Sequence, residues 1–343
     1  MKILVVHAWL RGNLGDVLQL SVLLSALREL EPRTLDLAGF PPRPADAAEE
    51  VLALSDRYVP DPFAWYWDFF PTFARKRVFA PAWRARRKAI FTRYDAIVCA
   101  PGPYLADYDA RAPSALCDVT VARELGLPVV LSSHSIGPLP PDALAAVAKA
   151  TVCISREPST HDYLRERGIP STLSADLAFL YPYVDKASRA APLGVKPPYR
   201  VIFLRSNNVE ARALRFEEGA LFEGSRLIAE ASTERLILAT SDIRRDERFL
   251  STVGRRLGVS WFGCRSVVEL VQLIAGSSGV VSDRYHPAIC GAVLGKAVRV
   301  LSNREPHKME GLKKLMAGRT VEESQELARA GLRTLRQALR GVA

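Results

Sequence analysis

The sequence predicts an α/β protein made of two doubly wound, Rossmann-like domains that face each other across a cleft. Short apolar runs alternate with amphipathic helical stretches along the chain, which is the pattern of βαβ units and parallel sheets. A proline-rich segment near the middle interrupts this alternation. The length of 343 residues gives each half enough chain to bury its own core.

The first predicted domain covers residues 1–185. It opens with an apolar strand at 2–7, followed by a loop and an amphipathic helix at 16–30. Further strands are predicted at 34–37, 96–100, 128–132 and 151–154. Helices are predicted between and after them, at 113–125, 142–149 and 160–167.

The second predicted domain covers residues 199–318 and follows a proline-rich linker at 186–198. Its strands are predicted at 200–204, 235–239, 260–262, 279–282 and 298–301. Its helices are predicted at 219–231, 245–257, 266–275 and 288–295. The remaining residues, 319–343, place four leucines on one stripe and predict a helix that packs on a domain.

Bulk properties narrow the class of protein. Hydrophobic residues at 48% and charged residues at 24% are ordinary for a soluble globular protein. The net charge of +10 favours acidic partners, but the signatures of nucleic-acid-binding folds are absent, so we expect no nucleic-acid partner. No uncharged run is long enough to span a membrane and the apolar start is too short for a signal peptide, so the expected location is cytoplasmic.

The five cysteines and five histidines give no support for a metal site or a disulfide framework. The cysteines are scattered, odd in number and never spaced as CxxC, and most lie in apolar runs. No two histidines share a spacing typical of metal ligands. We therefore expect buried free thiols, no metal and no bound cofactor.

The segment at 280–287 is the most informative in the chain. A β-branched run ends in Arg284 and His286, and Pro287 stands where a helix would begin, a position that proline favours. The arginine and the histidine would then lie between the carboxyl end of a strand and the amino end of a helix, where backbone N–H groups and the helix dipole favour anions. This pattern predicts a site for an anionic substrate that needs a proton.

The loop after the first strand is the second candidate. Gly12 and Gly15 allow close approach of backbone to a ligand, and Asn13 and Asp16 lie beside them. The spacing is not that of a dinucleotide-binding loop. Asp16 is interpreted either as a helix cap or as a catalytic acceptor or base for a hydroxyl in the cleft.

Five motifs together resemble the polysaccharide pyruvyl transferase family, over about residues 3–311. They occur in the family's order: residues 12–16 (Gly-Asn-Leu-Gly-Asp), 135–138 (Ser-Ile-Gly-Pro), 155–157 (Ser-Arg-Glu), 175–179 (Ala-Asp-Leu-Ala-Phe) and 283–286 (Asp-Arg-Tyr-His). The resemblance implies a fold similar to GT-B glycosyltransferases, with an acceptor-side first domain and a donor-side second domain. It also implies that a pyruvyl group passes from phosphoenolpyruvate to two sugar hydroxyls, giving a ketal.

The resemblance also implies roles for particular residues. The family's phosphoenolpyruvate-binding Arg-x-His matches Arg284 and His286, with His286 as the general acid, and a further family arginine matches Arg156. Lys308 and Tyr285 are added as donor-side candidates. Arginines suit this donor because they bind phosphate and carboxylate bidentately. The alternatives are purely structural roles. The two arginines could form ion pairs, His286 could cap or pack against a helix, and Lys308 could be solvated.

The chain departs from the family pattern in several places. Pro101 and Pro103 flank Gly102 where the family has three glycines, His134 stands where glutamine is common, and Tyr285 stands where leucine is common. His134 is a candidate cleft residue, with a core histidine as the alternative. The acceptor therefore stays open among a sugar nucleotide, a lipid-linked sugar and a small glycosylated molecule. The rival functions are a GT-B glycosyltransferase and a diverged member that uses another anionic donor.

Residues 61–93 form an unusual excursion in which aromatic residues precede arginines and lysines. Such a segment suits peripheral contact with a membrane or an acceptor-binding loop, and equally a helix whose aromatic side chains are buried.

Overall fold

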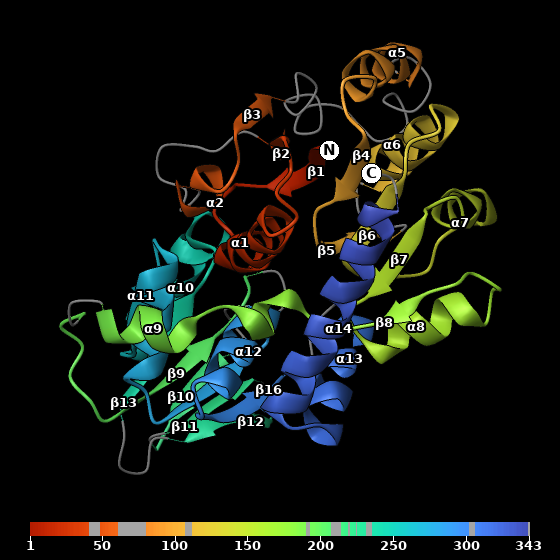
Figure 1. Ribbon diagram of the computed structural model, residues 1–343. Helices are drawn as coiled ribbons and strands as arrows, with labels where there is room; N and C mark the ends of the chain where they lie inside the picture. The colour runs from red at the N-terminus through yellow and green to blue at the C-terminus, as the bar shows by residue number, and fades with distance from the viewer. Residues whose placement is uncertain are drawn as a thin grey trace.

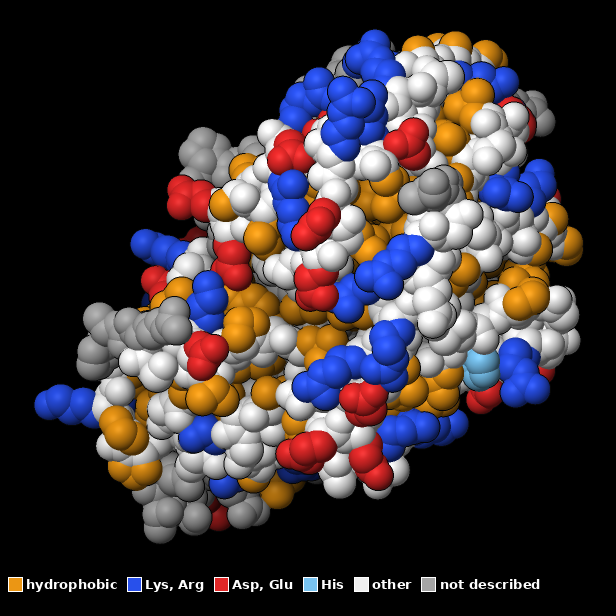
Figure 2. Space-filling view, in the orientation of Figure 1, with side chains coloured by type: hydrophobic (Ala, Val, Ile, Leu, Met, Phe, Trp, Pro, Cys, Tyr) orange, Lys and Arg blue, Asp and Glu red, His pale blue; other side chains and the backbone are white. Residues whose placement is uncertain are grey.

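The computed structural model describes residues 1–40, 49–60, 80–106, 112–189, 193–206, 214–218, 220–223, 225–230, 235–301 and 306–341 (Figure 1). It contains two α/β domains, each built on a parallel sheet, as the sequence predicted. No helix in these ranges is long and apolar enough to cross a bilayer. Figure 2 shows basic and acidic side chains intermixed over one face of the molecule.

The sheet of the first domain has the strand order β3-β2-β1-β4-β6-β7-β8, and β5 pairs with β6. Because β2 and β3 lie on one side of β1 and β4 lies on the other, the direction of winding reverses between β1 and β4. The strands are β1 (Lys2–Trp9), β2 (Thr34–Phe40), β3 (Arg57–Pro60), β4 (Ala96–Cys99), β5 (Gly102–Leu105), β6 (Val129–Ile136), β7 (Val152–Ser155) and β8 (Thr172–Leu173).

Helices cover both faces of this sheet. Ile3 and Val5 of β1 face the core beneath α1, while Leu4 and Val6 face the core beneath α6. Burial on both faces explains why β1 reads as a continuous apolar run. The helices are α1 (Leu14–Arg28), α2 (Glu49–Ala53), α5 (Ala80–Phe91), α6 (Ala112–Glu124), α7 (Pro141–Val147), α8 (Pro158–Arg165) and the short 3₁₀ helix η1 (Leu177–Leu180).

The sheet of the second domain has the order β14-β13-β9-β15-β16. Its strands are β9 (Tyr199–Phe203), β13 (Arg235–Thr240), β14 (Ser260–Gly263), β15 (Gly279–Ser282) and β16 (Ala297–Val300). Its helices are α10 (Ile243–Leu257), α11 (Val267–Ala275) and α12 (Tyr285–Val293), and α9 (Tyr183–Arg189) packs on α11. After α13 (Pro306–Gly318), α14 (Val321–Arg340) returns to the first domain and packs on η1, β6, β7 and β8 (Figure 1).

The predicted helix at 219–231 is wrong. This part of the chain forms an antiparallel meander of β10 (Leu214–Glu217), β11 (Ala220–Glu223) and β12 (Arg226–Glu230). The dipeptides Glu218-Gly219 and Gly224-Ser225 separate the three strands, and such pairs are typical of two-residue hairpin turns. Leu221 of β11 and Ile228 of β12 are both buried, so each of these neighbouring strands directs an apolar side chain into the core.

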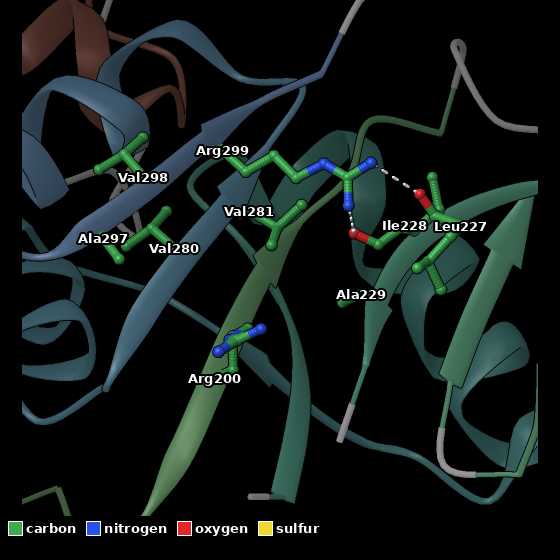
Figure 3. A pocket seen from close by; sticks show the side chains of 9 residues that line it. All are labelled: Arg200, Leu227, Ile228, Ala229, Val280, Val281, Ala297, Val298 and Arg299. Carbon is green, nitrogen blue, oxygen red and sulfur yellow. Dashed lines mark hydrogen bonds between the residues drawn. The ribbon is translucent and has the colours of Figure 1, made fainter. Parts of the chain in front are cut away.

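The meander packs over the second sheet and leaves a pocket of about 310 Å³ between β12 and the strands β9, β15 and β16 (Figure 3). Arg299 of β16 donates to the carbonyl oxygens of Leu227 (2.9 Å) and Ile228 (3.2 Å). These hydrogen bonds fasten the meander to the edge strand of the sheet.

The helix after β15 begins earlier than predicted. It starts at Tyr285 rather than at Pro287, with Arg284 as its N-cap residue. Pro287 is still in the first turn, where a missing N–H leaves no hydrogen bond unmade. His286 therefore belongs to the helix itself and not to the loop before it.

Candidate active site

The backbone between β15 and α12 is held in place by its own side chains. Ser282 Oγ accepts a hydrogen bond from the N–H of Arg284 (2.9 Å) and donates to the carbonyl oxygen of the same residue (2.7 Å). The carboxylate of Asp283 accepts from the N–H of Arg205 (3.1 Å) at the end of the neighbouring strand β9. The side chains of residues 284–286 therefore start from a fixed backbone.

His286 lies at the contact between the two domains. Its side chain is 7% exposed, and its Nε2 atom is 3.6 Å from Oδ2 of Asp176 in the first domain. The other side of the ring packs on Gly15 at the start of α1, where a β-carbon would overlap the ring. The second glycine of the Gly-Asn-Leu-Gly-Asp motif is thus required by the approach of His286.

Arg156 is the centre of the hydrogen bonds around Asp176. Its side chain is fully buried, and its Nη1 atom donates to Asp176 Oδ2 (2.9 Å) and Gln19 Oε1 (3.2 Å). Its Nε atom donates to Ser135 Oγ (2.6 Å) and Glu157 Oε2 (3.2 Å). One carboxylate oxygen of Asp176 therefore faces both Arg156 and His286, and Asp176 Oδ1 caps η1 by accepting from the N–H of Ala178 (2.8 Å).

Tyr285 and Lys308 complete this group. The guanidinium of Arg156 lies 4.5 Å from the centre of the Tyr285 ring, and the ammonium of Lys308 lies 5.3 Å from it. Both distances are typical of cation–π contacts. We call His286, Asp176, Arg156 and Tyr285 the interdomain cluster.

Neighbouring charges keep Asp176 and Arg156 ionised despite their burial. Burial alone would raise the pKa of Asp176, but His286 and Arg156 more than offset this and leave that pKa below its usual value. Burial would also lower the pKa of Arg156, but the carboxylates of Glu157 and Asp176 hold it above the ordinary value. The carboxylate of Asp176 is therefore a fixed negative charge beside the imidazole.

Arg284 has different partners from His286. Its guanidinium forms an ion pair with Asp246 of α10, whose side chain is nearly fully buried. Asp246 also accepts from the hydroxyl of Thr240 (2.8 Å) and the N–H of Ser206 (3.1 Å). His286 and Arg156 thus both face Asp176 of the first domain, whereas Arg284 pairs with Asp246 within the second domain.

The first loop connects the two domains. Gly12 has a φ of +72°, a conformation that glycine adopts readily. Asn13 is the N-cap of α1: its Oδ1 accepts from the N–H of Gly15 (3.2 Å), and its Nδ2 donates to Asp16 Oδ2 (2.8 Å). The N–H of Leu14 donates to the carbonyl oxygen of Ser241 in the second domain (2.9 Å). Asp16 thus supports the cap without being the cap itself.

His134 has partners other than those of His286. It is fully buried on β6, and its Nε2 atom is 2.9 Å from the hydroxyl of Tyr104. Burial, Arg156 and His7 lower its pKa to about 3, so the ring is neutral near pH 7. Residues 61–79 of the 61–93 excursion, which include most of its aromatic residues, lie outside the described residues. In the described part, Trp83 and Arg87 of α5 are buried against Asp118.

Asp176 and several partners of the predicted arginines were not themselves predicted as site residues. Asp176, Ser135 and Glu157 lie inside three of the five motifs that resemble the family, so those motifs could have indicated them. Gln19 and Asp246 lie outside all five motifs. No group of three metal-ligating side chains occurs in the part of the chain that the structure describes.

Known structures with a similar arrangement of helices and strands show the type of fold. UDP-GlcNAc 2-epimerase from Methanocaldococcus jannaschii, in complex with UDP-GlcNAc and UDP, has a TM-score of 0.61 and 11% identity, over 99% of this chain and 100% of that one. The enzyme of the same name from Rickettsia bellii has a TM-score of 0.59 and 12% identity, over 100% and 97% of the two chains. The fold is therefore that of the two-domain, GT-B-type sugar-nucleotide enzymes.

The sequence then gives the family. The family model for polysaccharide pyruvyl transferase matches residues 13–305, and the chain belongs to that family. No protein with a curated description matches in sequence.

Proposed function

We propose that the protein transfers a pyruvyl group from phosphoenolpyruvate to two hydroxyls of a sugar-containing acceptor. Membership of the polysaccharide pyruvyl transferase family supports the transfer. Because the similar M. jannaschii epimerase binds UDP-GlcNAc, a sugar nucleotide is the first acceptor to test. Lipid-linked sugars and small glycosylated molecules are the next.

The observation that carries this proposal is the pairing of His286 with Asp176 at the contact of the two domains. Histidine is the side chain that most often serves as a general acid, and the carboxylate of Asp176 lies 3.6 Å from the Nε2 atom of His286. We propose that His286 gives its proton to the methylene carbon of phosphoenolpyruvate. General acid catalysis of this kind contributes about 10²–10⁴ in rate.

Protonation of that carbon creates a cationic centre at the carbon that bears the phosphate ester. The first sugar hydroxyl attacks this centre, phosphate then leaves, and the second hydroxyl closes the ketal. The methyl group of the product keeps the proton from the enzyme, and the product gains one pyruvate less one water.

We assign the two arginines different parts in this reaction. Arg156 is a positioning residue, because it is fully buried and acts through Asp176 on His286. Arg284 and the N-terminus of α12 would bind the donor's phosphate or carboxylate. Lys308, whose ammonium lies 5.3 Å from the centre of the Tyr285 ring, would add positive charge as a further donor-side group.

The test is a reaction with phosphoenolpyruvate and a panel of UDP-sugars, lipid-linked sugars and free pyranosides. Phosphate release together with a mass gain of one pyruvate less one water in an acceptor would support the proposal. The second candidate is a sugar-nucleotide enzyme of another kind, which the GT-B-type fold favours. Release of UDP without phosphoenolpyruvate would support that candidate instead.

A further inference from the structure

A second group of titratable side chains lies in the first domain, apart from the interdomain cluster. It consists of His7 on β1, Tyr104 on β5, His134 on β6 and Asp118 on α6, and we call it the switch-point cluster. The His7 Nε2 atom is 3.0 Å from Asp118 Oδ2, and the ring centres of His7 and Tyr104 are 5.6 Å apart. The hydroxyl of Tyr104 is 2.9 Å from His134 Nε2.

The place of this cluster in the sheet is informative. The winding of the first sheet reverses between β1 and β4, and β4 ends at Cys99 between the strands that carry His7 and His134. In open α/β sheets, ligands bind outside the carboxyl ends of the strands at such a reversal. The switch-point cluster occupies that position.

The backbone is distorted on both sides of β4 so that the two histidines can reach this position. The register of β1 against β2 shifts between Val5 and Ala8, and His7 has a φ of +63°. The register of β6 against β7 shifts between Leu131 and His134, and Ser133 has a φ of +48°. Bulges re-aim side chains, and strained non-glycine residues gather at functional sites.

Asp118 has the environment of a carboxylate that orients a histidine. It is fully buried, and its Oδ1 atom accepts from Trp83 Nε1 (3.2 Å) and lies 3.1 Å from Arg87 Nε, which leaves Oδ2 for His7. The His7 side chain keeps 6% of its surface exposed, whereas its Nε2 atom is buried. A carboxylate oxygen 3.0 Å from Nε2 favours the tautomer in which Nε2 carries the proton and Nδ1 the lone pair, although the two side chains are not aligned as a hydrogen bond in this structure.

The switch-point cluster adjoins the interdomain cluster without sharing a side chain with it. The N–H of Arg156 donates to the carbonyl oxygen of His134 (3.1 Å), so one residue of each cluster is joined at the ends of the neighbouring strands β6 and β7. Ketal formation needs one proton given to carbon and a proton taken from each of two hydroxyls, so a second proton acceptor beside the sugar would serve the reaction.

We propose that His7, oriented by Asp118, is the general base for the acceptor hydroxyl, so that the switch-point cluster is the acceptor side of the active site. This inference rests on the proposed function. The O–H bond of the first hydroxyl breaks, its proton goes to His7 Nδ1, and its oxygen bonds to the cationic carbon of the donor. His7 later releases this proton to water, while the departing phosphate takes the proton of the second hydroxyl.

The test compares His7→Asn with His161→Asn. Asparagine tolerates the left-handed backbone at position 7, so the variant should fold, and a thermal melt checks this. His161 lies on α8, outside both clusters, and serves as the matched control. Each variant is titrated with phosphoenolpyruvate and assayed for phosphate release, first with UDP-N-acetylglucosamine and then with whichever sugar of the panel the wild-type enzyme turns over.

We expect His7→Asn to bind phosphoenolpyruvate as the wild type does and to lose at least about 10²-fold in turnover. His7→Gly should regain part of its turnover with added imidazole, which a purely structural role would not allow. Wild-type turnover in His7→Asn, weakened donor binding, or no rescue would overturn the role of His7. A wild-type protein that releases no phosphate with any sugar would instead reject the proposed function, and the role of His7 with it.

Discussion

Gly15 and His286 lie so close across the contact between the two domains that a β-carbon at position 15 would overlap the imidazole ring. The first glycine-rich motif and the last motif of the chain therefore meet in space, although 270 residues separate them in the sequence. This contact explains why the start of α1 needs a glycine at a helical position, where alanine would otherwise favour the helix by about 1 kcal/mol.

Gly15→Ala tests this contact. The added methyl group must displace His286, and overpacking of this kind costs about 1–3 kcal/mol. We expect a lower free energy of unfolding by chemical denaturation and at least a tenfold loss of phosphate release. Gly318→Ala is the matched control, because a β-carbon there meets no atom within 4 Å. Equal behaviour of the two variants would contradict the close contact.

Asp176→Asn tests the carboxylate of the interdomain cluster through the pH dependence of stability. The folded pKa of Asp176 lies below its ordinary value of 3.8, so its contribution to stability is complete above about pH 4 and is lost as the pH falls through the folded pKa. The wild type should therefore lose stability below pH 4 more steeply than Asp176→Asn does. Denaturation curves at pH 7 and pH 3 measure this, with the exposed Asp162→Asn as control. Parallel losses in wild type and Asp176→Asn would count against the assignment.

Arg156→Met tests whether Arg156 holds the cluster together. Its removal leaves the carboxylates of Asp176 and Glu157 buried without their cation, which costs about 3–5 kcal/mol. We expect a loss of that size in the free energy of unfolding, measured by denaturant titration. Arg165→Met on the exposed face of α8 should change it by less than about 0.5 kcal/mol. A loss no larger than that of the control would show that Arg156 is dispensable for the fold.

Arg284→Gln separates donor binding from a structural ion pair. A hydrogen bond to a charged group is worth about 1.5–3 kcal/mol, so loss of a donor contact should weaken phosphoenolpyruvate binding by about tenfold or more. Asp246→Asn removes the partner of Arg284 but keeps the guanidinium, and it should not weaken binding. Calorimetric titration of both variants measures this. If both variants bind phosphoenolpyruvate with wild-type affinity and lose the same thermal stability, Arg284 serves only the fold.

Local sequence was sufficient for most of the fold. Strand β15 matches its predicted bounds, because a β-branched run between Gly279 and the polar residues after Ser282 leaves little choice. The predicted helix at 219–231 is wrong because a turn dipeptide divides this stretch into the two short strands β11 and β12. The start of α12 was misplaced because Pro287 is also tolerated at the third helical position.

The site was only partly predictable, because its contacts join distant parts of the chain. The sequence indicated His286 and Arg156 as separate candidates, each at the end of a strand. It could not show that Asp176 lies between them, since 109 residues separate Asp176 from His286. For the same reason the sequence could not reveal the ion pair of Arg284 with Asp246, or the distorted backbone that turns His7 toward Asp118.

His286→Ala is the most direct test of whether His286 protonates the donor. Phosphoenolpyruvate binding and phosphate release are measured on the same preparation of wild type and variant, with a sugar that the wild type accepts. We expect the variant to keep its affinity for phosphoenolpyruvate within about threefold and to lose at least about 10²-fold in turnover, because it lacks the proposed proton donor. Phosphate release at the wild-type rate in His286→Ala would contradict this role.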